Sequence, residues 1–238
     1  MTLSKKSVAV LCAVMVLNCA TAAPPDGKAS LNAVIARMDK AAADFKVMSA
    51  QVTYVTYTAV LNESSTETGT VVMKKVQPGE VQGLVQFLSP DPYELKFEKR
   101  TVQIYRPKIK QLEVYDLAKY SDQVDRFMML GFGMPGTELA RDYDMTVVRN
   151  GPGQGESGNP TIQLRLIPKS SDAKQYVKSI DVWIPEEGNP YPEREKILLN
   201  SDDYKLITYS DLKINPALAP DALQLKVPAG VKTVYPGK

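Results

Sequence analysis

The sequence contains no histidine and only two cysteines among its 238 residues. Without histidine the chain has no Ser-His-Asp triad and no Cys-His pair, and zinc sites built on imidazole are excluded. An enzyme would be confined to carboxylate, lysine, tyrosine or serine chemistry, and no constellation of these residue types indicates catalysis. We therefore expect a protein that is not an enzyme and that holds no cofactor and no metal.

Both cysteines lie near the N-terminus, which has the pattern of an export signal. Two lysines precede a short apolar run over residues 7–17, and an A-x-A site at Ala20–Ala22 predicts cleavage after it. The run is shorter than the roughly 20 residues that a membrane-spanning helix needs. The predicted organisation is a signal peptide over residues 1–22 and one domain over residues 23–238, located in the periplasm.

Cys19 leaves a second processing route open. Residues 16–19, Val-Leu-Asn-Cys, are similar to a bacterial lipobox, in which the cysteine becomes lipidated, with Asn18 in place of a small residue. A form anchored to the membrane through Cys19 is therefore an alternative to a protein released into the periplasm.

Removal of the signal changes the charge and the redox chemistry of the chain. Cleavage takes away 22 of the 238 residues, both cysteines and two lysines, and leaves 27 basic and 27 acidic residues. A chain without net charge has no electrostatic footprint for nucleic acid, so we expect no nucleic-acid partner. Its stability must come from an apolar core, because no disulfide is available.

The hydrophobic pattern predicts one helix followed by many strands. Apolar residues recur every three or four positions over residues 28–45, which indicates a helix. The period then changes to two, and strands are predicted at 47–61, 69–76, 81–88, 93–98, 101–106, 111–115, 145–149, 161–167, 177–184, 193–199 and 204–214. Residues 118–130 have a second helical pattern, and 137–143 a short helical turn. Short connections favour antiparallel hairpins, so the expected fold is mainly β (α+β), with a strongly curved antiparallel sheet.

Two short motifs match known signatures but stand in the wrong context. Residues 131–136 match G-x-G-x-x-G, yet they follow a helical pattern instead of a strand and contain Pro135. Residues 171–174 match S-x-x-K, but in a turn and without its companion motifs. We interpret the first motif as a mobile loop with apolar tips at Phe132 and Met134.

Several strands alternate between an apolar and a polar face. Tyr93, Leu95 and Phe97 face one way, for example, with charged residues between them. A wide apolar face of an open curved sheet is not left to water. It must be covered by helices, by a ligand, or by both in turn, and the Met- and Phe-rich segment 127–134 suits a movable cover.

Six segments, in this order and spacing, resemble the LolA-like periplasmic carriers, which escort lipoproteins across the bacterial periplasm. They are residues 69–75, 101–107, 164–169, 180–184, 203–212 and 225–231. The resemblance implies an incomplete antiparallel barrel of about ten to eleven strands, with helices covering a concave apolar face. It implies a carrier that binds lipoprotein acyl chains, or another lipid, for transfer towards the outer membrane. Its partners would be an inner-membrane donor complex and an outer-membrane acceptor, and we expect a monomer.

Two other functions remain open. One is an acceptor lipoprotein anchored through Cys19, and the other is an envelope-stress or lipid sensor of the same fold that binds a signalling partner.

The resemblance also implies a basic residue on an early strand that holds the lid through helix carbonyls, and Lys75 is the best-placed equivalent. The remaining site candidates are apolar residues that we expect to line the lipid cavity or its lid. They are Tyr54, Phe87, Leu95, Phe97, Ile104, Phe127, Met128, Leu130, Phe132, Ile180, Val182 and Leu206.

Overall fold

The computed structural model describes residues 30–77, 80–99, 101–117, 130–151 and 160–236. The predicted signal peptide and Cys19 lie outside the described residues, as do Phe127 and Met128 and most of the predicted helix at 118–130. In the described part of the chain, no helix is long and apolar enough to cross a membrane.

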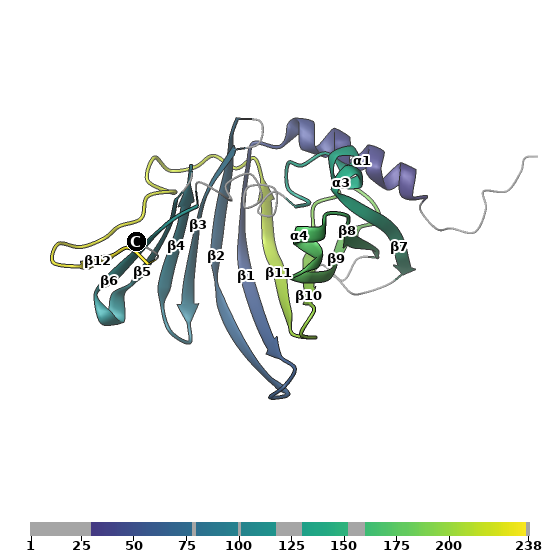
Figure 1. Ribbon diagram of the computed structural model, residues 1–238. Coiled ribbons are helices and arrows are strands. Elements are labelled where there is room, and N and C mark those ends of the chain that lie inside the picture. The colour runs from purple at the N-terminus through teal and green to yellow at the C-terminus, as the bar shows by residue number, and fades with distance from the viewer. Residues whose placement is uncertain (1–29, 78–79, 100, 118–129, 152–159, 237–238) are drawn as a thin grey trace, which may run out of the picture.

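One continuous sheet of twelve strands dominates the described part of the chain (Figure 1). The helical elements are α1 (Leu31–Asp44), η1 (Pro107–Ile109), α3 (Gly136–Asp142) and α4 (Ser171–Lys174). The strands are β1 (Val47–Thr58), β2 (Glu63–Gln77), β3 (Glu80–Ser89), β4 (Tyr93–Glu98), β5 (Thr101–Arg106), β6 (Gln111–Asp116), β7 (Tyr143–Gly151), β8 (Thr161–Pro168), β9 (Val177–Pro185), β10 (Arg194–Leu199), β11 (Tyr204–Ile214) and β12 (Lys232–Val234). Their order in the sheet is β12-β6-β5-β4-β3-β2-β1-β11-β10-β9-β8-β7, and it does not close into a barrel. The predicted class, mainly β with an incomplete curved barrel, is confirmed.

The junction between α1 and β1 is fixed by side-chain hydrogen bonds. Ser30 caps the start of α1 with its hydroxyl. At the other end, the Asn215 side chain accepts hydrogen bonds from the backbone N–H groups of Lys46 and Val47 at 2.8 and 3.1 Å. It also donates to the carbonyl of Asp44 at 2.8 Å. The first residue after β11 thereby holds the first helix against the first strand.

The register of the antiparallel pairs shows which side chains share a face. Ala50 of β1 lies opposite Val71 of β2, which lies opposite Val85 of β3. Val85 in turn lies opposite Leu95 of β4, and Leu95 lies opposite Ile104 of β5. Because residues in register point to the same side of a sheet, these five form one apolar row across five strands.

The two halves of this face differ in how they are covered. Over β7–β10, α1 and α3 pack directly on the sheet (Figure 1). The residues that fill this half are almost completely buried, and they include Val34, Met38, Leu139, Ile162, Leu164, Leu166, Ile180, Val182 and Ile184. The corresponding residues of β1–β5 include several half-exposed side chains. The first half is therefore a filled core, and the second is the candidate for a ligand-binding face.

The structure departs from the sequence predictions at several elements. β2 begins at Glu63, six residues earlier than predicted, because it continues the hairpin with β1. The S-x-x-K segment forms the one-turn helix α4, capped by Ser170, where a turn was predicted. The three-residue strand β12 was not predicted, and it pairs in parallel with β6.

Candidate functional site

Aromatic and aliphatic side chains cover the concave face of β1–β5. The Tyr54 and Phe87 ring centroids lie 6.0 Å apart, and Phe87 stacks on Tyr93 at 4.7 Å. Leu95 and Ile104 extend the surface towards the edge of the sheet, and both are half-buried. Five strands at about 4.8 Å spacing give an apolar face roughly 19 Å wide. A face of this width and composition matches an extended hydrocarbon better than a compact polar ligand.

A polar cluster borders this apolar face along β5 and β6. Glu113 lies at its centre and accepts hydrogen bonds from Gln111 at 2.9 Å and from the Tyr115 hydroxyl at 3.0 Å. The Arg106 guanidinium lies 3.5 Å from the Glu113 carboxylate and 5.1 Å from the centre of the Tyr93 ring. The pKa of Tyr115 is raised, chiefly by its hydrogen bond to Glu113. The apolar face therefore ends in groups able to meet the polar end of an amphiphile.

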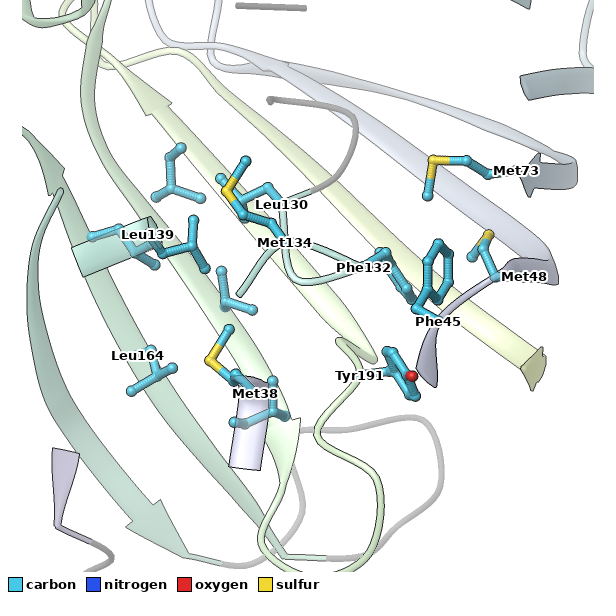
Figure 2. Close-up of a cluster of buried hydrophobic side chains, with 14 of the residues drawn as sticks. Met38, Phe45, Met48, Met73, Leu130, Phe132, Met134, Leu139, Leu164 and Tyr191 are labelled. Atoms are coloured by element: carbon cyan, nitrogen blue, oxygen red, sulfur yellow. The ribbon is translucent and has the colours of Figure 1, made fainter. Parts of the chain in front are cut away.

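Residues 130–134 form a loop that borders the apolar face from the other side. Leu130, Phe132 and Met134 are each at most 5% exposed, and Figure 2 shows them within the buried cluster. The Phe132 ring stacks on Tyr191 at 6.0 Å and meets Tyr209 edge-on at 5.1 Å. The predicted apolar tips of this loop are thus inserted into the core. The sequence predicts a mobile loop with apolar tips, and the structure buries both tips; the mobility of the loop stays a prediction.

Two glycines of the G-x-G-x-x-G motif have packing roles in this loop. Gly133 has a φ of +78°, and a Cβ atom there would lie 2.5 Å from the Phe45 ring. A Cβ on Gly136 would lie 2.9 Å from the carbonyl oxygen of Ile35, because α3 approaches α1 closely at that point. The motif therefore reflects a tight turn and a helix contact.

Lys75 reaches the loop and the first helix from β2. Its Nζ lies 3.5 Å from the carbonyl oxygen of Ala42, in the last turn of α1, and 3.4 Å from that of Gly133. A cation is favoured at a helix C-terminus, where carbonyl groups lack partners. Three residues after the loop, in the first turn of α3, the backbone N–H and the hydroxyl of Thr137 donate hydrogen bonds to Asp39 of α1 at 2.9 and 3.0 Å. The C-terminal end of the 130–134 loop is thus linked to α1, through Lys75 at Gly133 and through Thr137 at the start of α3.

A buried carboxyl group lies beneath this loop. Glu195 of β10 is 6% exposed and shares the concave face with Ile197. Burial raises its pKa to about 8, although a hydrogen bond with Tyr209 partly opposes that shift. Within the described residues its Oε1 has no hydrogen-bond partner. Sequence reasoning missed this residue, although its alternation with Ile197 and Leu199 places it on an apolar face.

The structure separates the predicted cavity residues into distinct groups. Tyr54, Phe87, Leu95, Phe97 and Ile104 share the concave face of β1–β5, and Leu130 and Phe132 lie in the adjacent loop. Their role as a ligand cavity stays a prediction. Phe127 and Met128 lie outside the described residues.

Three of the predicted residues do not lie where a ligand would reach them. Leu206 pairs with Val55 and therefore lies on the opposite face of the sheet from Tyr54, so its assignment to the cavity was wrong. Ile180 and Val182 are on the concave face but only 2% exposed under α1 and α3. They belong to the filled core, and assigning them to an open cavity was also wrong.

Comparison with known proteins supports the fold. No protein-family model and no curated protein sequence matches the chain. Among solved structures, MucB, which has also been solved in complex with MucA, is similar at 18% identity and a TM-score of 0.51. That match covers 84% of this chain and 64% of MucB, so the chain spans less than two thirds of that protein.

Two further matches cover nearly the whole of the other protein. A conserved protein from Thermus thermophilus matches at 13% identity and a TM-score of 0.50, over 87% of this chain and 99% of that one. A LolA superfamily protein from Nitrosomonas europaea matches at 12% identity and a TM-score of 0.39, over 83% and 99%. Proteins of the predicted LolA-like fold are thus among the matches, and at these identities the likeness to MucB and the Thermus thermophilus protein shows the fold alone.

Proposed function

We propose that this protein is a non-catalytic periplasmic carrier that binds acyl chains, of lipoproteins or of another lipid, on the concave face of β1–β5. The observation that carries the proposal is the contrast between the two halves of one face. The half under α1 and α3 is filled, whereas Tyr54, Val85, Leu95 and Ile104 are only half-buried. An apolar face of that size, next to a loop of buried Phe and Met residues, is suited to a hydrocarbon ligand.

Burial of the acyl chain supplies the binding energy. Each buried CH₂ group contributes ~0.8 kcal/mol, so a 16-carbon chain contributes roughly 10 kcal/mol before ordering costs are subtracted. Such binding reverses slowly, and release requires either movement of the 130–134 loop or an acceptor that competes for the chain. The cluster around Glu113 and Arg106 then lies where the polar end of the ligand emerges.

The proposal is tested by native mass spectrometry of the full chain purified from the envelope of a bacterial host. We expect a bound acyl lipid, and displacement of a fluorescent fatty acid by unlabelled fatty acid in solution. A protein that carries no lipid and takes up no fluorescent fatty acid would not be a carrier.

Lys75 provides a test of the loop as a lid. Replacing it in Lys75→Met removes the contacts with Ala42 and Gly133, and we expect a loss of about 1 kcal/mol of stability. We also expect faster dissociation of bound fatty acid, measured by stopped-flow displacement. Lys75→Arg should behave like the wild type, because a cation of similar reach remains at the carbonyl groups.

Lys74 is the matched control for this experiment, since it is the neighbouring residue on β2 and points to the exposed face. Lys74→Met should leave dissociation unchanged. Equal dissociation rates in Lys74→Met and Lys75→Met would show that Lys75 does not hold a lid.

A second candidate function is that of a sensor that binds a membrane-bound signalling protein. The likeness to MucB, which has been solved in complex with MucA, favours this function as the second candidate. Affinity capture from cross-linked envelopes separates the two functions. A carrier should be recovered with lipidated proteins. A sensor should be recovered with one membrane protein, whether or not a lipid is bound to the sensor.

A further inference from the structure

A pocket of about 460 Å³ lies between the β9–β10 connection and the end of β11. The described residues that line it are Pro185, Asn189, Tyr191, Glu193, Tyr209, Ser210, Asp211, Leu212 and Ile214. Tyr209 and Ile214 are in register with Val52 and Met48 of β1, so the pocket opens on the concave side of the sheet. It is separated from the apolar face of β1–β5 by Phe132, which packs against Tyr191 and Tyr209.

Contacts with α1 hold the pocket wall in place. The Arg37 guanidinium donates hydrogen bonds to the carbonyl groups of Pro185 and Gly188 at 2.9 and 3.2 Å. The Tyr191 hydroxyl donates to the carbonyl of Ala41 at 2.9 Å. On the opposite wall, the register of β11 against β1 shifts at Asp211, which has a φ of +51°. The pocket is therefore a built feature of the fold.

The charge of the lining points to a positively charged ligand. Glu193 and Asp211 are its ionisable acids, and among the described lining residues there is no lysine or arginine. The Oε2 atom of Glu193 is buried and has no hydrogen-bond partner among the described residues. Burial of this oxygen makes the charge of the Glu193 carboxylate costly, and a cation in the pocket, beside the half-buried Glu193 side chain, would offset that charge.

The remaining lining residues favour an organic cation over a metal ion. The rings of Tyr191 and Tyr209 attract an ammonium group through their π-systems, and quaternary ammonium ligands are bound in this way. Leu212, Ile214 and Pro185 add apolar surface, which a hydrated metal ion would not use. The volume lies within the range of small-molecule pockets.

We propose that this pocket binds an organic ammonium group, with Glu193 as its counter-ion. The group is either the amine of a lipid headgroup or that of a small soluble molecule. This inference does not depend on acyl-chain binding, because the pocket and the apolar face of β1–β5 share none of their lining residues.

Calorimetric titration of the full chain with choline tests the proposal, with the uncharged carbon analogue of choline as the comparison ligand. We expect saturable binding of choline only, and about tenfold weaker binding in Glu193→Gln, which keeps the shape of the side chain. Asp91→Asn, in an exposed ion pair at the β3–β4 turn, is the control and should bind as the wild type does. Equal binding of both ligands, or unchanged affinity in Glu193→Gln, would overturn the proposal.

A second variant tests the proposal independently, in case Glu193→Gln does not fold. Asp211→Asn removes the other charge of the pocket, and asparagine tolerates the positive φ at that position. We expect choline affinity about threefold lower, since Asp211 is exposed and its charge is screened. Displacement of choline by a lysophospholipid with an ethanolamine head, but not by one with a glycerol head, would assign the amine to a lipid. Displacement by free ethanolamine alone would assign it to a soluble ligand.

Discussion

Replacing Leu95 by glutamate should abolish fatty-acid binding while leaving the protein folded. Leu95 lies in the apolar row, between Val85 and Ile104, and is half-buried. An acyl chain on this face would have to strip water from the new carboxylate, which costs several kcal/mol. We expect an affinity at least about a hundredfold lower in a fluorescence displacement assay.

Leu206 provides the matched control, because it is also a half-buried leucine on a strand of the same sheet but lies on the opposite face. Leu206→Glu should bind fatty acid as the wild type does. If Leu95→Glu retains wild-type affinity, or if both variants lose binding equally, the ligand does not occupy the concave face of β1–β5.

Replacing Glu195 by glutamine should stabilise the protein strongly at pH 8. The pKa of Glu195 is about 8 in the folded protein, against an ordinary value of 4.5, and the main cause is burial. The folded state therefore favours the protonated carboxyl, and this group makes its full contribution to stability below about pH 4.5. That contribution is lost as the pH rises towards 8, at up to about 1.4 kcal/mol per pH unit.

Glutamine preserves the shape and cannot ionise, so Glu195→Gln should remove this loss. We expect the variant to be more stable than the wild type at pH 8 by about 3 kcal/mol, and the difference to shrink towards pH 5. Chemical denaturation at several pH values measures both quantities. Glu63→Gln, at an exposed position of β2, should show no such pH-dependent gain. Parallel stability curves for the wild type and Glu195→Gln would contradict a buried, protonated Glu195.

The alternation of residue types was sufficient to predict much of the sheet. β4, β5 and β11 begin and end where the sequence predicts, at Tyr93–Glu98, Thr101–Arg106 and Tyr204–Ile214. β4 shows the reason most clearly, since Tyr93, Leu95 and Phe97 lie on one face and charged residues on the other, so that a shift of one residue would bury the charges. The strand β12 was missed because three residues are too few to show a period.

Alternation does not reveal which face is concave when both faces carry apolar residues. On β11, Leu206 and Ile207 are adjacent and point to opposite sides. Lys205 lies on the concave face with Ile207, and its Nζ sits 5.9 Å from the centre of the Tyr54 ring. A lysine with an apolar stem can occupy such a face, so the charge pattern was a poor guide to orientation there.

Nor does a single strand show what covers it. The pattern of β9 placed Ile180 and Val182 correctly on one face, but only the packing of α1 and α3 shows that this half is filled. The pocket around Glu193 could not be predicted from a single strand either. It forms between the β9–β10 connection and the shifted end of β11, which are separate segments of the sequence. Lys75 was identified from the family resemblance, and its contacts with Ala42 and Gly133 depend on a helix and a loop from either side of it.

Photo-cross-linking with a fatty acid that carries a diazirine on its chain tests the central claim most directly. If the protein binds acyl chains on the concave face of β1–β5, labelling should saturate, and an excess of unlabelled fatty acid should suppress it. The modified residues should map to the inward-facing positions of β3, β4 and β5, such as Val85, Leu95 and Ile104. Labelling confined to the opposite face, or labelling that competitor does not reduce, would contradict acyl-chain binding on this face.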